Sequence, residues 1–149
     1  MNVNLAVATA ADLPPIHAIE QGDDIQKFVF AYTLKEHEFA YASTDITYLK
    51  IIANDELAGY FILREEPELN RVEFRRLAIK PSIRGIGQQA IKLMEAYCVE
   101  DMGYRLIWLD VYADNLRAIH IYEKLGYKRV GHKLHNDRDM YIYQKDLVD

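Results

Sequence analysis

The loop Arg84-Gly85-Ile86-Gly87-Gln88-Gln89-Ala90 stands between a strand-like stretch, Val72–Ile79, and an amphipathic helical pattern. That pattern places four apolar residues on one helical face: Ala90, Ile91, Met94 and Cys98. Glycines without a Cβ allow a ligand to approach the backbone closely. The first turn of a helix leaves amide N–H groups without partners, and its dipole favours an anion. Strand, glycine loop and helix together predict a phosphate cradle, to which Arg84 can add a charge-assisted contact.

Other interpretations of this loop exist. Gly85-x-Gly87-x-x-Ala90 also matches the dinucleotide fingerprint, and Asp110 lies 20 residues beyond Ala90, about where that motif places an acid. Residues 80–84 separate the strand from the first glycine, however, and only 59 residues follow Ala90, too few for a doubly wound domain. A P-loop is excluded because no Gly-Lys-Ser/Thr occurs. An ordinary loop with two turn glycines is the simplest alternative.

Outward from the loop, the sequence predicts one α/β domain over residues 1–149, with a mixed sheet. A three-strand meander precedes a β-α-β-α-β order. The expected strands are 3–8, 46–53, 57–64, 72–79, 106–111, 130–134 and 140–143. Turns are expected at Asn54-Asp55-Glu56 and around His135-Asn136-Asp137, each joining two strands into a hairpin. The expected helices are residues 13–19, ended by Gly22, a vaguer stretch around Ile25–Ala42, one after Gly87, and one capped by Asn115 and ended by Gly126.

Composition limits the classes of protein. The chain has 149 residues, with 18 basic and 23 acidic side chains and a net charge of −5, which argues against a general nucleic-acid binder and leans slightly toward a cationic substrate. Cys98 is the only cysteine, so no intrachain disulfide forms; on its apolar face it is expected to be buried and inert. Neither a signal peptide nor a run of 18 apolar residues is evident, so we expect a cytoplasmic protein without a membrane partner.

A second motif follows the next expected strand. Asn115-x-x-Ala118-x-x-x-Tyr122-x-x-x-Gly126-Tyr127 begins 31 residues after Arg84. With this pair of motifs the sequence resembles the GNAT superfamily of acetyl-coenzyme A-dependent N-acyltransferases. The family's pyrophosphate loop, Arg/Gln-x-x-Gly-x-Gly/Ala, is matched from Arg84 onward, except that Gln89 occupies its last small position. The second signature is matched at every position.

The resemblance implies a GNAT-like α/β (α+β) fold. Its central sheet is mixed and mostly antiparallel, with about seven strands and about four flanking helices, and it is splayed between the fourth and fifth strands. Coenzyme A would lie in that opening, with its pantetheine arm on strand backbone and its pyrophosphate on the loop amides. The implied cofactor-binding residues are Leu77, Ala78, Ile79, Arg84, Gly85, Ile86, Gly87, Gln88, Gln89, Ala90, Asn115 and Ala118.

The resemblance also implies the chemistry. Tyr122 corresponds to the family's usual general acid, and a phenol with a pKa near 10 stays protonated at neutral pH and can donate to a departing thiolate. A core tyrosine is the alternative. Glu73 is the candidate base, although a lone carboxylate is a poor base unless its pKa is raised, and a chain of water molecules can replace it. A backbone amide of Leu77–Ile79 could polarise the carbonyl oxygen.

The predicted function is therefore transfer of an acetyl group from acetyl-coenzyme A to a primary amine by direct attack, without a metal. A small amine, an amino acid or a polyamine is favoured over a protein N-terminus. Two other hypotheses stay open: a non-catalytic acyl-coenzyme A sensor and a nicotinamide-dependent oxidoreductase. A small-molecule amine is the expected partner, nucleic acid is not, and a homodimer is left open.

Two remaining groups of residues are assigned structural roles. His132 and His135 fall in an expected strand, where side chains three residues apart point to opposite faces, so a metal site is not predicted. An aromatic group is expected to be mainly core, or else a wall of the acceptor site: Phe28, Phe30, Tyr32, Phe39 and Tyr41.

Overall fold

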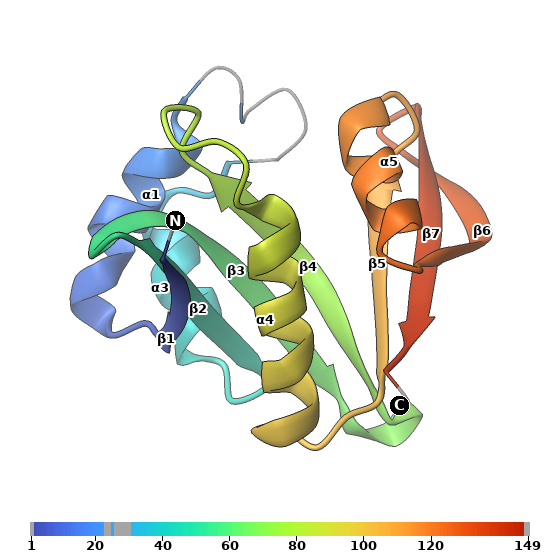
Figure 1. The fold of residues 1–149 in the computed structure, drawn as a ribbon, viewed down its shortest axis with the longest axis horizontal. Coiled ribbons are helices and arrows are strands. Elements are labelled where there is room, and N and C mark those ends of the chain that lie inside the picture. Colours follow the sequence, from blue (N-terminus) through green and yellow to red (C-terminus); the bar gives the residue numbers. More distant parts are fainter. Residues whose placement is uncertain (1, 23–24, 26–30, 148–149) are drawn as a thin grey trace.

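One seven-stranded sheet forms the centre of the molecule (Figure 1). The computed structural model describes residues 2–22, 25 and 31–147. The strand order is β1-β2-β3-β4-β5-β7-β6, and every neighbouring pair is antiparallel except β4 and β5, which are parallel. The strands are β1 (Val3–Val7), β2 (Ile46–Ala53), β3 (Glu56–Glu66), β4 (Arg71–Ile79), β5 (Leu106–Tyr112), β6 (Lys128–His135) and β7 (Arg138–Asp146). This mixed, mostly antiparallel sheet confirms the predicted fold class.

Helices pack on both faces of the sheet. In the part of the chain that is described they are α1 (Leu13–Glu20), α3 (Leu34–Ala42), α4 (Gly87–Glu100) and α5 (Leu116–Lys124), with 3-10 turns η1 (Ala10–Asp12) and η2 (Pro67–Leu69). The apolar face of α4, including Met94 and Cys98, is buried against one side of the sheet, while α1 and α3 cover the other (Figure 1). Cys98 is fully buried, as predicted, and burial raises the pKa of its thiol to about 12.

Two hairpins confirm their predicted turns. Asn54 and Asp55 join β2 to β3, and Asn136 and Asp137 join β6 to β7. All four residues have positive φ angles, between 50° and 67°. Two successive residues in this conformation suit the right-handed twist of the strands, and Asn and Asp tolerate it better than most side chains do.

The expected helix around Ile25–Ala42 differs from the structure. Ile25 is helical, but residues 31–33 are not, and α3 begins at Leu34. Extended Thr33 caps α3: the Thr33 hydroxyl accepts from the Glu36 amide at 3.1 Å and the Glu36 carboxylate accepts from the Thr33 amide at 2.8 Å. The core assignment was wrong for Phe39, which is 80% exposed on the outer side of α3. Phe28 and Phe30 lie outside the described residues.

Strands β4 and β5 separate almost as soon as they meet. They pair only at Val72 with Ile107 and at Glu73 with Trp108, and then diverge (Figure 1). Beyond Glu73, β4 is held by β3 alone. The predicted splay between the fourth and fifth strands is thereby confirmed. The single parallel pair also overturns the dinucleotide-binding interpretation, which requires a doubly wound parallel sheet.

A bulge in β4 changes which residues face each layer. Ile62 pairs with Arg76 and Leu63 pairs with Phe74, so Arg75 is the extra residue. Before the bulge, Phe74 packs in the α4 core; after it, Leu77 packs there and Ala78 packs in the α1 and α3 core. The bulge thus turns Arg76 toward α1 at the point where the two strands part.

A buried carboxylate ties α1 to the sheet and to α3. Glu20 is fully buried and accepts four hydrogen bonds: from the Tyr32 amide at 3.0 Å, His37 Nε2 at 2.8 Å, Arg76 Nη1 at 2.6 Å and the Tyr60 hydroxyl. His37 Nδ1 lies 2.7 Å from the Tyr48 hydroxyl. Burial alone would raise the pKa of Glu20, but the His37 hydrogen bond, the Arg76 charge and the Tyr60 hydrogen bond together lower it from 4.5 to about 2.

This carboxylate predicts a specific acid sensitivity. Since the pKa of Glu20 is depressed in the folded protein, its contribution to the free energy of unfolding is complete above about pH 4.5 and is lost as the pH falls toward 2. Glu20→Gln should lower the free energy of unfolding at pH 7 by about 3 kcal/mol, because Arg76 loses its buried partner, and should flatten the fall between pH 5 and pH 3. Urea unfolding across this range measures both effects. Glu38→Gln, on the exposed side of α3, is the control, and an equal slope for Glu20→Gln and wild type would contradict the assignment.

Candidate active site

Two cavities open where β4 and β5 diverge. The first, called the loop cavity here, has a volume of about 1250 Å³ and lies between the glycine loop, the start of α4 and α5. The second, the strand cavity, has a volume of about 680 Å³ and is bounded by β4, β5 and the β6–β7 hairpin. The residues common to both linings are Ile25, Leu77, Ile79, Asn115, Arg117, Ala118 and Tyr122. A ligand in one cavity can therefore contact a ligand in the other.

The loop cavity is suited to phosphate. The first hydrogen bond inside α4 runs from the Ala90 amide to the Ile86 carbonyl at 2.9 Å, so the amides of Gly87, Gln88 and Gln89 precede the helical ladder. Gly85 has a φ of +80°, which favours glycine, and the buried Ile86 side chain anchors the loop. Four cationic side chains and no acidic one are among the described lining residues: Lys80, Arg84, Lys92 and Arg117.

Most of the predicted cofactor-binding residues gather at these cavities. Leu77 and Ile79 line both, and residues 84–89 line the loop cavity. Ala78 lines only the strand cavity. Ala90 lines neither: its side chain is fully buried and its amide is already bonded within α4, so the structure does not bring it to the site. Gln89 does line the loop cavity despite its bulk.

Gly59 lines neither cavity, but it supports the strand that does, and sequence reasoning missed it. It pairs with Ile79 in the antiparallel ladder, and a Cβ at this position would lie only 2.2 Å from the Ala78 carbonyl oxygen. The adjacent Lys80 amide donates to the Ala58 carbonyl at 2.8 Å. A glycine inside a strand is the signal for such a close approach. Gly59 thus allows the end of β4 to lie close against β3. The other edge of β4 faces the opening.

Asn115 sits at the start of α5, directly after β5. Its Oδ1 accepts from the Ala118 amide at 3.4 Å, which confirms the predicted N-cap. Both residues line both cavities. The cap fixes the first turn of α5 at the opening, and the same helix carries Tyr122 one turn further on.

Tyr122 lies at the junction of the two cavities. Its ring packs edge-on against Phe74 at 5.7 Å between centroids and in a tilted arrangement against Tyr127 at 5.8 Å. Burial is the one cause acting on its hydroxyl, and it raises the pKa of Tyr122 above its ordinary value. The phenol is therefore a proton donor at neutral pH, with its ring held from two sides.

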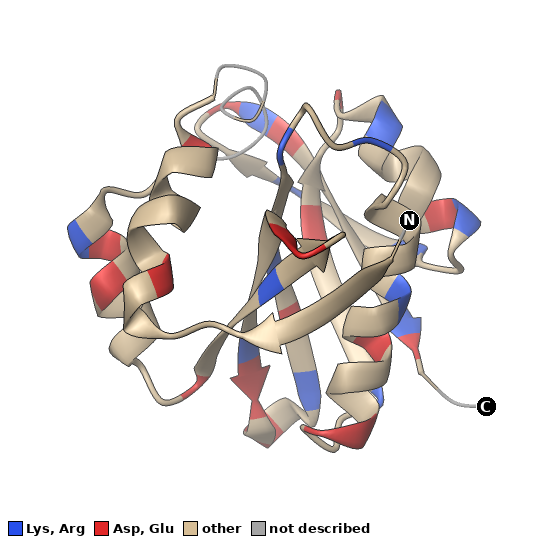
Figure 2. Cartoon of the chain, turned by 60° about the vertical axis from the view of Figure 1, so that its left-hand side comes forward, with Lys and Arg blue, Asp and Glu red and all other residues tan. Residues whose placement is uncertain are grey.

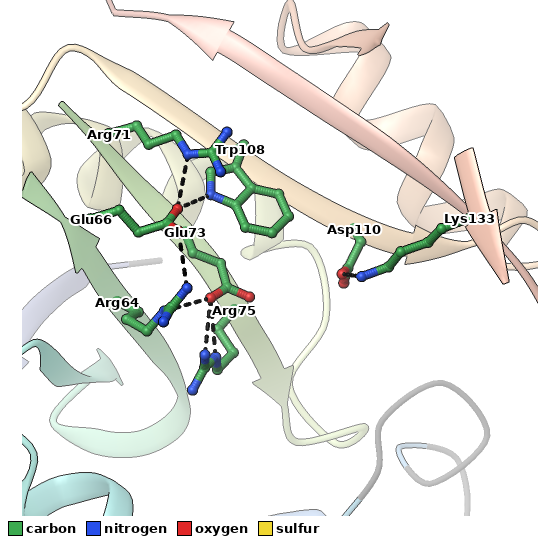
Figure 3. Close-up of polar contacts among 8 residues, drawn as sticks. All are labelled: Arg64, Glu66, Arg71, Glu73, Arg75, Trp108, Asp110 and Lys133. Atoms are coloured by element: carbon green, nitrogen blue, oxygen red, sulfur yellow. Dashed lines mark hydrogen bonds and ion pairs between the residues drawn. The ribbon is translucent and has the colours of Figure 1, made fainter. Parts of the chain in front are cut away.

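Glu73 lies apart from this junction. It is buried at the last β4–β5 pair and lines neither cavity. Its Oε1 accepts from Arg64 Nε at 3.1 Å and from Arg75 Nε and Nη2 at 3.3 and 3.1 Å (Figure 3). The structure therefore brings Tyr122, but not Glu73, to the place where the two cavities meet.

The wall of the strand cavity was largely missed by sequence reasoning. It contains Tyr32, Arg75, Arg76, Tyr112, Lys133 and His135. Asp110, considered above as the acid of the dinucleotide motif, lies here rather than in the loop cavity, and its Oδ2 is 2.7 Å from Lys133 Nζ. These residues come from distant parts of the chain and share no spacing, so no motif could reveal them.

Within residues 2–22, 25 and 31–147, no group of three or more His, Cys, Asp or Glu side chains is placed to hold a metal ion. His132 and His135 lie on β6 as predicted. No helix in the same described ranges is long and apolar enough to cross a membrane. Acidic and basic side chains are interspersed over helices and strands (Figure 2).

A splayed sheet with a glycine loop at its opening and a tyrosine between two cavities defines the class as an acyltransferase. The chain belongs to the acetyltransferase (GNAT) family, which it matches over residues 13–127. This is a family of acetyl-coenzyme A-dependent enzymes.

Individual relatives are distant. The chain is 28% identical over 126 residues to the [ribosomal protein bS18]-alanine N-acetyltransferase of Salmonella typhimurium, covering 83% of this chain and 79% of the relative. Its fold resembles the spermidine N-acetyltransferase of Vibrio cholerae in complex with coenzyme A and spermine, with a TM-score of 0.85, 21% identity and coverage of 97% and 95%. An aminoglycoside acetyltransferase in complex with coenzyme A and kanamycin gives 0.82, 22% identity and coverage of 97% and 95%. At such identities the structural likeness concerns the fold.

Substitution of Gly87 tests the loop cavity. A Cβ there would meet only Ile79 Cδ1, at 3.9 Å, so Gly87→Ala should leave both folding and coenzyme A binding nearly intact. Gly87→Trp should weaken coenzyme A binding by at least about tenfold, because the indole occupies the space beside the free amides. Calorimetric titration measures the affinity, and circular dichroism checks the fold. Equal affinities of a folded Gly87→Trp variant and wild type would remove the loop from the binding site.

Proposed function

We propose that the protein transfers an acetyl group from acetyl-coenzyme A to a primary amine, with residues 1–149 acting as one catalytic domain. The observation that carries the proposal is the position of Tyr122. This residue lines both the loop cavity, which has cationic walls, and the strand cavity. Two substrates must meet for a direct transfer, and this is the point where two adjoining cavities share a proton donor.

The loop cavity would hold the coenzyme. The amides of residues 87–89, with Arg84 and Lys92 beside them, suit the pyrophosphate. The edge of β4 beyond Glu73 has no β5 partner among the described residues, so the backbone at Leu77–Ile79 can pair with the pantetheine amides. Asn115 and Ala118 would contact the same arm. When bound, acetyl-coenzyme A supplies a thioester carbonyl carbon that is open to attack by an amine.

Groups of the protein would then stabilise the charge that develops on the carbonyl oxygen and protonate the leaving sulfur. A backbone amide of β4 polarises the carbonyl oxygen, and the Tyr122 hydroxyl gives its proton to the leaving sulfur. Since Glu73 lines neither cavity and is engaged by Arg64 and Arg75, the proton released by the amine passes to water in the strand cavity. The cytoplasmic compartment stays a prediction of the sequence, and a homodimer stays open.

Removal of the hydroxyl tests the acid. Tyr122→Phe keeps the ring between Phe74 and Tyr127 and should lower kcat by about 10²-fold or more, with little change in the Kd for coenzyme A. Free-thiol release measures kcat, and calorimetry measures Kd. Tyr97→Phe, on α4 and outside both cavities, is the matched control. An undiminished kcat for Tyr122→Phe would take Tyr122 out of the mechanism.

The pH profile offers an independent check. Burial raises the pKa of Tyr122, so the protonated, donating form persists to higher pH than that of an exposed tyrosine, whose pKa is about 10. We expect no falling limb of kcat from this group up to about pH 10. A limb centred near pH 9 that is present in wild type and absent in Tyr122→Phe would contradict the burial argument.

Binding and turnover together test the function itself. Calorimetric titration should show binding of acetyl-coenzyme A and none of NAD, and a screen of primary amines should then release free thiol. Binding of acetyl-coenzyme A without thiol release on any amine would favour the acyl-coenzyme A sensor. Absence of acetyl-coenzyme A binding would overturn the proposal.

A further inference from the structure

We infer that the amine acceptor carries an anionic group, a carboxylate or a phosphate, which is held by cations on the wall of the strand cavity. This inference rests on the proposed function and specifies its second substrate. It departs from the slight preference for a cationic substrate that the overall charge of −5 suggested.

The charge of the strand cavity is opposite to that of the chain. Among its described lining residues, four side chains are cationic and one is acidic: Arg75, Arg76, Arg117 and Lys133 against Asp110. An acceptor with several ammonium groups would bring its charges against these cations. In an acceptor with one amine and one anionic group, the anionic group would pair with these cations and the amine would stay available for reaction.

Arg75 ends a chain of alternating charges that leads into the cavity. Glu66 contacts Arg71 at 2.9 Å and Arg64 at 3.0 Å, and Glu73 then contacts Arg64 and Arg75 (Figure 3). The chain holds three cations and two anions, and its cavity end is positive. Asp45 acts electrostatically on Arg75 but lines neither cavity.

Arg75 has donors left for a ligand. It uses Nε and Nη2 on Glu73, is 30% exposed, and its Nη1 has no partner among the described residues. Glu73 therefore acts as a positioning residue, because it fixes the guanidinium plane while leaving one edge open. A fixed guanidinium edge suits a carboxylate or phosphate oxygen pair.

Lys133 faces the same cavity from the other side of the opening. It lies on β6, whereas Arg75 lies on β4, and Figure 3 shows the Lys133–Asp110 pair across from the arginine chain. Lys133 is 43% exposed, and its ammonium has three donors, of which Asp110 takes one. Arg76 is only 9% exposed and is bound to Glu20, so it adds to the field rather than serving as a contact.

Matched acceptors test the inference. Free-thiol release would be measured with 4-aminobutyrate against 4-aminobutanamide and with phosphoethanolamine against ethanolamine, so that each pair differs in the anion, and with spermidine as a polycation. We expect kcat/KM to favour the anionic member of at least one pair by about tenfold or more, and the preferred pair tells carboxylate from phosphate. Equal or better turnover of both neutral members, or of spermidine, would overturn the inference.

The two proposals can fail separately. Acetyl-coenzyme A binding with turnover of neutral amines or spermidine would overturn only the anionic acceptor. Acetyl-coenzyme A binding with no turnover of any anionic member would overturn the inference while leaving the coenzyme site in place. Loss of acetyl-coenzyme A binding itself would remove the proposed function.

Variants connect the preference to the named cations. Lys133→Gln and Arg75→Gln should each raise KM for the preferred anionic acceptor by about tenfold and leave KM for its neutral partner nearly unchanged. A merely structural effect would change both members of the pair. Lys133 is well exposed, so its variant should fold even if Arg75→Gln, which leaves Glu73 paired with Arg64 alone, does not. Lys35 is an exposed residue of α3 outside both cavities, so Lys35→Gln should leave the ratio of the two KM values unchanged. An unchanged ratio in a folded Lys133→Gln variant would contradict the assignment.

Discussion

The separation of β4 from β5 after only two residue pairs creates the opening on which both cavities depend. Beyond Glu73 the backbone groups on one edge of β4 have no partner from β5, although backbone N–H and C=O groups are normally bonded when buried. The strand can keep this open edge because β3 holds its other side, with Gly59 permitting the closest approach. The opening is therefore a built feature of the sheet, and an extended ligand with amide groups can complete it.

Cationic side chains line both cavities at the opening, but they are held in different ways. The loop cavity combines free helix amides with cationic side chains and is suited to phosphates. The strand cavity has its own cations, and two of the four that line it are tied to carboxylates outside the lining: Arg76 to Glu20 and Arg75 to Glu73. Paired cations are oriented more firmly than free ones, so they can discriminate among small acceptors by geometry as well as by charge.

Tyr122 links these two regions because α5 begins at the opening. Asn115 caps the helix at the end of β5, and the tyrosine two turns along faces back between the cavities. Its hydroxyl is affected by burial alone, whereas Glu73 is surrounded by guanidinium groups. The Tyr122 hydroxyl is thus in an uncharged, buried environment, whereas the Glu73 carboxylate is ion-paired. This difference supports Tyr122 as a proton donor and a mechanism without a dedicated carboxylate base.

The sequence by itself determined the family, the glycine loop, the Asn115 cap, the hairpin turns and the choice of Tyr122. Each depends on residues close together in the chain, whose local conformations are dictated by glycine, capping and turn chemistry. Only the tertiary structure decided that Ala90 is withdrawn from the site, that Glu73 is paired with two arginines and that the strand cavity is lined mainly by cations among its charged residues. Those properties depend on how α4 packs and on which side chains meet between β3, β4, β5 and β6, and such contacts follow no fixed sequence spacing.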